Sequence, residues 1–165
     1  MSFFKSYDYI IAGGGAAGLS LLFHCLQSAL KEKTFLVIDN SSKETNDRTW
    51  CFWEVGDGIF ENIVHHQWQQ LDFYSASFSK SLDIAPYSYK MIRGIDFYSH
   101  VKKSVATLEN IHFLQSEVLS IIDTEEGAVV KTDKGSFNAK WVFNSIREKD
   151  EREQAEAYHY LLQHF

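Results

Sequence analysis

Cysteine and proline are scarce in this chain of 165 residues, which contains two cysteines and a single proline. Cys25 and Cys51 lack the paired spacing of a zinc site or a C-x-x-C redox motif, and a disulfide framework needs more cysteines. The adjacent His65 and His66 point in different directions on a helix or a strand, which disfavours a shared metal ion. We therefore expect reduced thiols, a cytoplasmic location and no metal site.

Basic residues are in the minority, and long apolar runs are lacking. The net charge of −6 argues against nucleic acid as a partner, because binding to phosphates needs a concentrated basic surface. The first residues lack the basic and apolar regions of a signal peptide. No apolar run approaches the roughly 18 residues of a membrane-spanning helix. We expect no transmembrane segment, while a peripheral contact with the inner face of a membrane stays open.

Hydrophobic periodicity predicts an α/β fold. Residues 7–12 (YDYIIA) and 34–38 (TFLVI) are short runs of aromatic and β-branched residues, which are typical of buried strands. Residues 16–29 between them have the pattern of a helix that packs on a sheet. A strand, a helix and a second parallel strand make a right-handed crossover.

The rest of the chain predicts more strands around a second helix. Residues 41–58 show no clear period and are expected to be irregular, whereas the alternation over 68–89 predicts antiparallel strands. Helical spacing returns over 94–108. A small antiparallel meander with a turn at 124–127 is predicted from four short strands: 111–114, 117–123, 128–132 and 141–144. We expect residues 1–165 to form the N-terminal part of one domain, with an inserted segment at about 60–92.

The loop GGGAAG follows the first predicted strand and opens the first predicted helix. Gly13, Gly15 and Gly18 satisfy the pattern G-x-G-x-x-G, with Ala16 and Ala17 between the last two glycines. The first glycine permits the tight turn, the second lets the backbone approach a pyrophosphate, and the third lets helix and strand pack closely. Free amides at the start of the helix then face the phosphate charge.

Asp39 ends the second predicted strand, 21 residues after Gly18. A carboxylate there accepts hydrogen bonds from the ribose hydroxyls and repels a 2′-phosphate, which favours FAD or NAD over NADP. The alternative is a glycine-rich turn beside a surface aspartate. FAD and NAD share the ADP group, but the inserted strands and the meander are more typical of a glutathione-reductase-like FAD-binding domain of the Rossmann type.

Four segments of the chain resemble the bacterial lycopene β-cyclase family. They are DYIIAGGGAAGLSL (8–21), NDRTWCFWE (46–54), MIRGIDFY (91–98) and YHYLLQHF (158–165). The resemblance implies a flavoprotein that binds FAD, with the reduced form needed for activity and NAD(P)H as a possible electron source. It implies cyclisation of the ends of lycopene, or of a related linear carotene, to ionone rings without net redox change.

The resemblance also suggests roles in the segment 46–54. Trp50, Phe52 and Trp53 either line a carotene channel or belong to the core. Glu54 is a candidate catalytic residue that holds charge or a proton. Arg48 is a candidate for contact with the cofactor phosphate or ribose, and the alternative is a surface ion pair.

Arg93 follows a predicted strand and precedes the helix that starts near Gly94. Related flavoproteins contact the cofactor from this junction, so Arg93 is a candidate cofactor ligand. The alternative is a salt bridge at the start of the helix.

Family members are longer than this chain, and the resemblance places the main proton-donating acid after Phe165. The fold is therefore expected to be incomplete at its C-terminus, and the chain to be inactive alone. Two other interpretations stay open: an FAD-dependent monooxygenase or dehydrogenase of a small substrate, and a nucleotide-binding remnant without catalysis.

Overall fold

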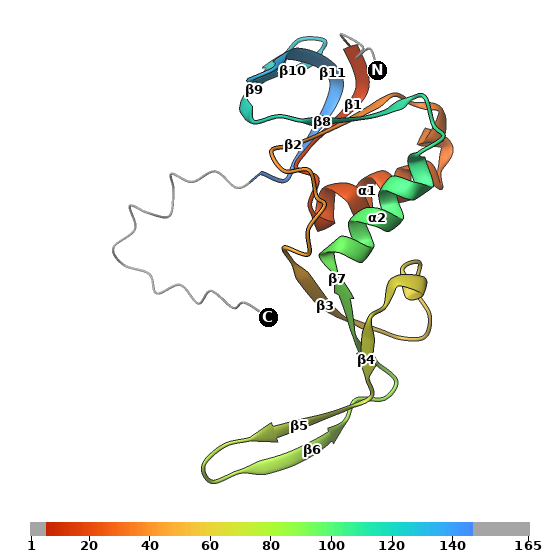
Figure 1. Ribbon diagram of the computed structural model, residues 1–165, viewed down its shortest axis with the longest axis vertical. Coiled ribbons are helices and arrows are strands. Elements are labelled where there is room, and N and C mark those ends of the chain that lie inside the picture. Colours follow the sequence, from red (N-terminus) through yellow and green to blue (C-terminus); the bar gives the residue numbers. More distant parts are fainter. Residues whose placement is uncertain (1–5, 147–165) are drawn as a thin grey trace. The chain divides into compact units, whose positions relative to one another are not determined.

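The computed structural model describes residues 6–146 (Figure 1). The predicted tail 147–165, which includes the YHYLLQHF segment, lies outside the described residues. The chain divides into two compact units, one made of the residues up to Ser42 and from Val105 onward, and the other of Lys43–Ser104. Each unit is described by itself. The predicted inserted segment, 60–92, lies within the second unit.

The first unit contains a six-stranded sheet with the strand order β8-β2-β1-β11-β10-β9. Strands β8, β2, β1 and β11 run parallel, and β9 and β10 join them antiparallel to their neighbours. The bounds are β1 (Ser6–Ala12), β2 (Phe35–Asp39), β8 (Ile111–Gln115), β9 (Val118–Thr124), β10 (Gly127–Thr132) and β11 (Gly135–Asn144). A helix connects β1 to β2 along the chain, and the two strands are parallel. This arrangement confirms the predicted α/β fold.

Strand β11 links the meander to the parallel part of the sheet. Its first half pairs antiparallel with β10, and its second half pairs parallel with β1, where Tyr9 lies opposite Trp141. The sequence predicted only 141–144 as a strand. The earlier residues also alternate, because Phe137 and Ala139 are buried while Asn138 and Lys140 are exposed. The meander is thus an extension of the central sheet.

The helices of the chain are short. Helix α1 (Ala16–Leu26) ends before the predicted limit, and a 3₁₀ turn (Ala29–Glu32) follows it, capped by the Ser28 hydroxyl, which accepts from the Leu30 amide at 3.1 Å. The second unit holds helix α2 (Gly94–Val105), except for its last residue, and a 3₁₀ turn (Glu61–Ile63). Within residues 6–146, no helix is long and apolar enough to cross a membrane.

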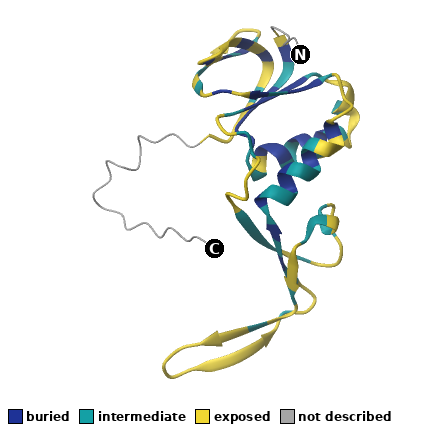
Figure 2. Cartoon of the chain, in the orientation of Figure 1, coloured by how far each residue is buried: buried dark blue, intermediate teal, exposed yellow. Residues whose placement is uncertain are grey.

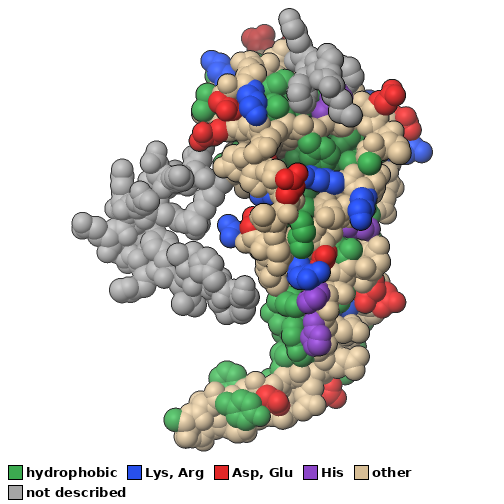
Figure 3. Space-filling view, in the orientation of Figure 1, with side chains coloured by type: hydrophobic (Ala, Val, Ile, Leu, Met, Phe, Trp, Pro, Cys, Tyr) green, Lys and Arg blue, Asp and Glu red, His purple; other side chains and the backbone are tan. Residues whose placement is uncertain are grey.

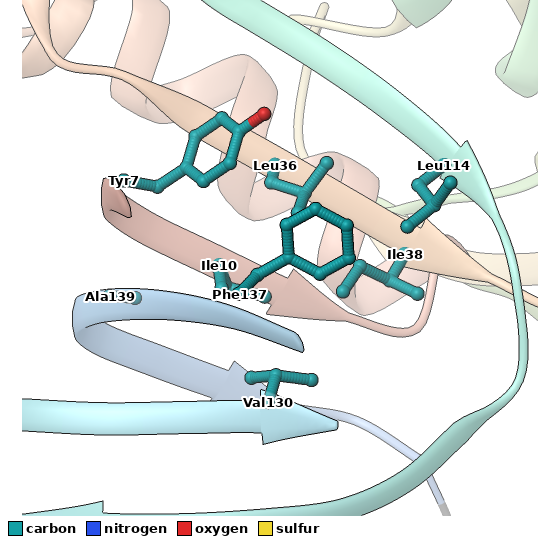
Figure 4. Close-up of a cluster of buried hydrophobic side chains, with 8 residues drawn as sticks. All are labelled: Tyr7, Ile10, Leu36, Ile38, Leu114, Val130, Phe137 and Ala139. Carbon is teal, nitrogen blue, oxygen red and sulfur yellow. The ribbon is translucent and has the colours of Figure 1, made fainter. Parts of the chain in front are cut away.

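A cluster of eight buried side chains fills one part of the first unit (Figure 4). Five strands contribute to it: Tyr7, Ile10, Leu36, Ile38, Leu114, Val130, Phe137 and Ala139. The Tyr7 hydroxyl lies 2.7 Å from His112 Nδ1, so this buried pair joins β1 to β8 across the intervening β2. Because the core draws on both the parallel strands and the meander, it stabilises them as one unit.

Asp8 of β1 links this strand to β11 and to the residue just before β2. Its carboxylate accepts from the Thr34 amide at 3.1 Å, just before β2, and from Lys140 Nζ of β11 at 2.8 Å. The bonds from Lys140 and Thr34 lower the pKa of Asp8 from 3.8 to about 2. The charged form of Asp8 is therefore stabilised in the folded protein.

The second unit contains a three-stranded antiparallel sheet and a separate hairpin. The sheet order is β3-β7-β4, with β3 (Thr49–Glu54), β4 (His66–Trp68) and β7 (Ser88–Arg93). The hairpin pairs β5 (Gln70–Tyr74) with β6 (Ser79–Asp83). These strands confirm the predicted alternation over 68–89. The prediction of irregular structure over 41–58 is wrong for β3, because the aromatic run TWCFWE pairs with β7 along its whole length.

Helix α2 follows β7 directly and supplies the buried side chains Phe97, Tyr98 and Val101. The Trp50 ring of β3 meets Phe97 and Tyr98 edge to face, at centroid distances of 5.5 and 5.7 Å. Figure 2 shows α2 and β7 as mainly buried or half-buried, whereas the β5–β6 hairpin is exposed. The interior of this unit therefore lies between α2 and β3.

We predict that Asp8→Asn destabilises the chain by about 1 kcal/mol at pH 7, after allowance for the solvent around Lys140. Because the folded pKa lies below the ordinary value, the stabilisation is complete above that value and is lost as the pH falls through about 2. Urea unfolding midpoints of the parent and the variant should therefore converge as the pH approaches 2. Glu125→Gln, in the exposed turn after β9, is the control and should show no such convergence.

Candidate functional site

The glycine loop joins the end of β1 to the start of α1. The Gly13 amide donates to the Ile38 carbonyl of β2 at 2.8 Å, which anchors the loop to the sheet. Gly13 has a φ of +104°, a conformation that side chains disfavour, and a Cβ there would also collide with the Ser145 hydroxyl. The fold itself therefore requires glycine at this position.

Gly18 lies in the first turn of α1, against the backbone of the loop. A Cβ at this position would collide with the Gly13 carbonyl oxygen and would lie 2.8 Å from Ile11 Cγ2. The helix and β1 can approach this closely only because the side chain is missing. Glycine at position 18 is therefore also explained by the fold.

Gly15 differs from both of these glycines. Its φ of −81° is ordinary, and a Cβ added to it would meet no protein atom within 4 Å. The described structure thus offers no internal reason for glycine at this position. Open space beside the first turn of a helix is what a bound pyrophosphate needs, because the backbone must come close to its oxygens.

The first turn of α1 has free hydrogen-bond donors. In the described structure no side chain caps the helix, and its first turn contains no acidic residue. The amides of Ala16 and Ala17 point out of the helix start, where the helix dipole favours negative charge. The small side chains of these two alanines also leave the amides accessible to a ligand.

Asp39 lies beside the loop, at the end of β2. Its Oδ2 accepts from the Gly14 amide at 2.7 Å, and its Oδ1 accepts from the Ser41 amide at 2.8 Å. These bonds fix the carboxylate next to the glycine loop. A carboxylate oxygen has more than one acceptor position, so the same group is able to accept from ribose hydroxyls.

The glycine loop, Ala16, Ala17 and Asp39 therefore form one constellation in the first unit. It presents amide donors where a pyrophosphate has negative charge and a carboxylate where a ribose has hydroxyls. A 2′-phosphate would meet the negative charge of Asp39. The residues present thus fit the ADP part of FAD or NAD.

The two candidate arginines lie in the second unit, near the end of the β3–β7 ladder, where Thr49 pairs with Arg93. Arg93 donates from Nε to Asp96 Oδ2 at 2.6 Å and from Nη2 to Asp96 Oδ1 at 3.0 Å. This is the salt bridge at a helix start that the sequence allowed as the alternative. Arg48 is exposed, and its Nη1 donates to the Asp47 carbonyl at 3.2 Å. A cofactor contact of either arginine stays a prediction.

The structure separates the three aromatic residues that the sequence grouped together. Trp50 and Phe52 lie on the face of β3 from which Trp50 meets α2, while Trp53 points from the opposite face and is 52% exposed. Trp50 therefore has the core role that the sequence allowed as an alternative. For Phe52 and Trp53, the role of lining a carotene channel stays a prediction.

Glu54 takes part in a buried ion cluster around Lys90. Lys90 is 1% exposed, and its Nζ donates to Glu54 Oε2 at 2.9 Å, to the Gly56 carbonyl at 2.6 Å, and to Glu61 Oε2. Burial disfavours the charged ammonium, but the bonds to Glu61 and Glu54 outweigh it and raise the pKa of Lys90. Glu54 thus has a structural partner in this unit.

Sequence reasoning missed Lys90 and Glu61. The available signal was a lysine between the apolar residues Tyr89 and Met91 of a predicted strand, because a buried charge needs partners. Cysteine, histidine and acidic side chains of residues 6–146 form no group of three that suits a metal ion.

Comparison with protein families identifies a family that matches most of the chain. The sequence profile of a family described as lycopene cyclase protein matches residues 8–165. Among curated proteins, none matches the chain.

Several solved flavoenzymes share the fold. PqsL from Pseudomonas aeruginosa, described as a probable FAD-dependent monooxygenase, is 13% identical, with a TM-score of 0.66 over 83% of this chain and 41% of its own. The p-nitrophenol 4-monooxygenase PnpA from Pseudomonas putida DLL-E4 is 14% identical, with a TM-score of 0.63 over 84% and 40%. NikD, described as an unusual amino acid oxidase, is 12% identical, with a TM-score of 0.55 over 84% and 50%.

At these identities the likeness shows the fold alone, and it confirms the predicted Rossmann-like FAD-binding fold. The chain spans between two fifths and half of the length of these three structures.

The two glycines of the helix start give a matched pair of substitutions. We expect Gly18→Ala to lower the free energy of unfolding by about 3 kcal/mol, because the added methyl group overlaps the Gly13 carbonyl. Gly15→Ala should cost less than about 1 kcal/mol, the small difference between these residues at a helix N-cap. Urea unfolding of the purified variants measures both values. Equal losses would show that Gly15, too, is required by the fold.

Proposed function

The chain belongs to the lycopene cyclase family, and we propose on this premise that it holds the nucleotide part of FAD in an enzyme that cyclises linear carotenes. The open space at Gly15, beside an uncapped helix start and next to Asp39, is the observation that carries the cofactor assignment. The proposed substrate is lycopene, or a related linear carotene, and the proposed product carries ionone rings.

The residues of the first unit have separate roles in holding the cofactor. The amides of Ala16 and Ala17 bind the pyrophosphate, and Gly15 lets the phosphate oxygens approach the backbone. Asp39 accepts from the adenosine ribose. The bound flavin, in its reduced form, supplies negative charge near a carbocation, and NAD(P)H is the proposed electron source.

The proposed reaction leaves the oxidation state of the carotene unchanged. An acid adds a proton to an end double bond, the resulting tertiary carbocation closes the ring by attack of a second double bond, and another proton leaves. The product therefore has the same formula as the substrate. Such a cation needs an apolar site that excludes water and has electron density nearby.

Glu54 is not proposed as the main acid of this reaction. The Glu54 carboxylate accepts a hydrogen bond from Lys90 Nζ, so its negative charge stabilises the buried ammonium. The same ammonium donates to Glu61, which links Glu54 to the segment that contains Glu61. By the family resemblance, the main acid is proposed to lie after Phe165. Because lycopene is wholly apolar, the enzyme is proposed to collect it at the surface of a membrane.

Cofactor binding is tested in a complete cyclase polypeptide that contains residues 1–165. We expect Gly15→Ala and Asp39→Ala each to weaken FAD binding at least about tenfold, which corresponds to about 1.4 kcal/mol. Quenching of flavin fluorescence on binding measures the affinity. Asp123→Asn, an exposed acid on β9, is the control and should bind as the parent does. Unchanged FAD affinity in both site variants would refute the assignment of the glycine loop.

The reaction type is tested with lycopene in heavy water, using the same polypeptide with reduced FAD. Ring closure by proton addition and loss should give a product with one deuterium for each ring formed, without stoichiometric consumption of oxygen or NAD(P)H. Mass spectrometry and an oxygen electrode make these measurements. Oxygen uptake coupled to insertion of an oxygen atom into a substrate would indicate a monooxygenase and overturn the proposal.

A further inference from the structure

The β3-β7-β4 sheet has two faces of different chemistry. One face carries Trp50, Ile92 and Lys90, of which Ile92 and Lys90 are buried and Trp50 contacts α2. The residues between them in sequence point to the opposite face, which we call the aromatic face. Its members are Thr49, Cys51 and Trp53 of β3, Tyr89, Met91 and Arg93 of β7, and His66 and Trp68 of β4. Arg93 and Thr49 form the last row of this face, and the Arg93 guanidinium is bonded to Asp96.

Three rings form a row across the aromatic face. Tyr89 lies opposite Trp53 on one side and opposite Trp68 on the other. The ring centroids of Trp53 and Tyr89 are 4.7 Å apart, and those of Tyr89 and Trp68 are 5.8 Å apart. Each strand thus contributes one ring, and the rings follow one another at about the spacing of adjacent strands. Trp53 keeps half of its surface open to solvent.

A second row runs beside the first and carries no acid, lysine or arginine. Met91 lies opposite Cys51 and His66, so this row offers a thioether, a thiol and an imidazole. Partial burial and a hydrogen bond with Cys51 raise the pKa of Tyr89, so its hydroxyl stays neutral. Figure 3 shows hydrophobic side chains gathered beside histidines in this part of the chain.

We propose that the aromatic face holds the conjugated chain of a linear carotene. The inference rests on the proposed function, which supplies the substrate class. A carotene is long, flat and conjugated, and it has no polar group to pair with a charge. The first two rows, which hold rings and sulfur atoms, suit such a ligand, because stacking and dispersion act along its whole length. The opposite face is unsuitable, since α2 covers Trp50 and the ion cluster occupies the region of Lys90.

A matched pair of tryptophan substitutions tests the proposal in the complete cyclase polypeptide. We expect Trp53→Ala to raise the KM for lycopene, supplied in detergent micelles, about tenfold. The value of kcat should change much less, because the ring binds the chain and takes no part in proton transfer. Trp141→Ala removes a tryptophan on β11 that is more exposed than Trp53, at 66% against 52%, and should leave KM unchanged. Trp53→Phe should restore most of the affinity, since it keeps a ring.

Lycopene binding, measured by the shift of its visible absorption on transfer from micelles to protein, keeps the test independent of turnover. Trp68→Leu is the second variant and should weaken this binding in the same way. If the parent cyclises lycopene but Trp53→Ala and Trp68→Leu bind and react as it does, the aromatic face is refuted and the proposed function stands. Such a result would indicate that another part of the polypeptide covers these rings. If the parent binds lycopene without cyclising it, the proposed function fails. The comparison of lycopene binding by the parent and the two tryptophan variants then still tests whether the aromatic face is the binding site.

Discussion

The contact between Gly18 and the Gly13 carbonyl is the constraint on which the nucleotide site depends. The start of α1 lies so close to the loop after β1 that no side chain fits between them. This proximity brings the first amides of the helix to the carboxyl end of the parallel strands. The same edge of the sheet holds Asp39, whose hydrogen bond to the Gly14 amide joins the end of β2 to the loop. Backbone packing thus places the donors and the carboxylate before any ligand arrives.

Local sequence was enough to predict this part of the molecule. The strand, the glycines, the helix and the acid lie within residues 7–39, and each imposes its structure on its immediate neighbours. The glycine pattern also predicted a separate role for each of its members: the tight turn for Gly13, the approach of a pyrophosphate for Gly15 and the close packing of helix and strand for Gly18. The structure adds the physical contacts: a Cβ at Gly13 or Gly18 would collide with protein atoms, while Gly15 borders open space. That difference distinguishes a residue that shapes the loop from one that leaves room for a ligand.

The second unit was harder to predict because its structure depends on partners distant in sequence. The run TWCFWE lacks a local signal for its partner, and it becomes a strand by pairing with β7, about forty residues later. Pairing also decides which side chains meet. Lys90 reaches Glu54 only because the two strands are adjacent, and the segment after β3 brings Glu61 to the same ammonium. No periodicity in the sequence contains that information.

Strand alternation in β3 also keeps two incompatible chemistries apart. Glu54 faces the buried ammonium of Lys90, where a charge has hydrogen-bonding partners in place of water. Trp53, one residue earlier, points to the other side, where neutral rings and sulfur atoms lie in two rows. A lysine among those rings would repel a developing carbocation and would retain water that an apolar chain must displace. By pairing Lys90 with carboxylates, the sheet keeps that charge on the covered face, and Arg93 stands in the last row of the aromatic face, bonded to Asp96. The first two rows thus offer rings and sulfur atoms to a hydrocarbon.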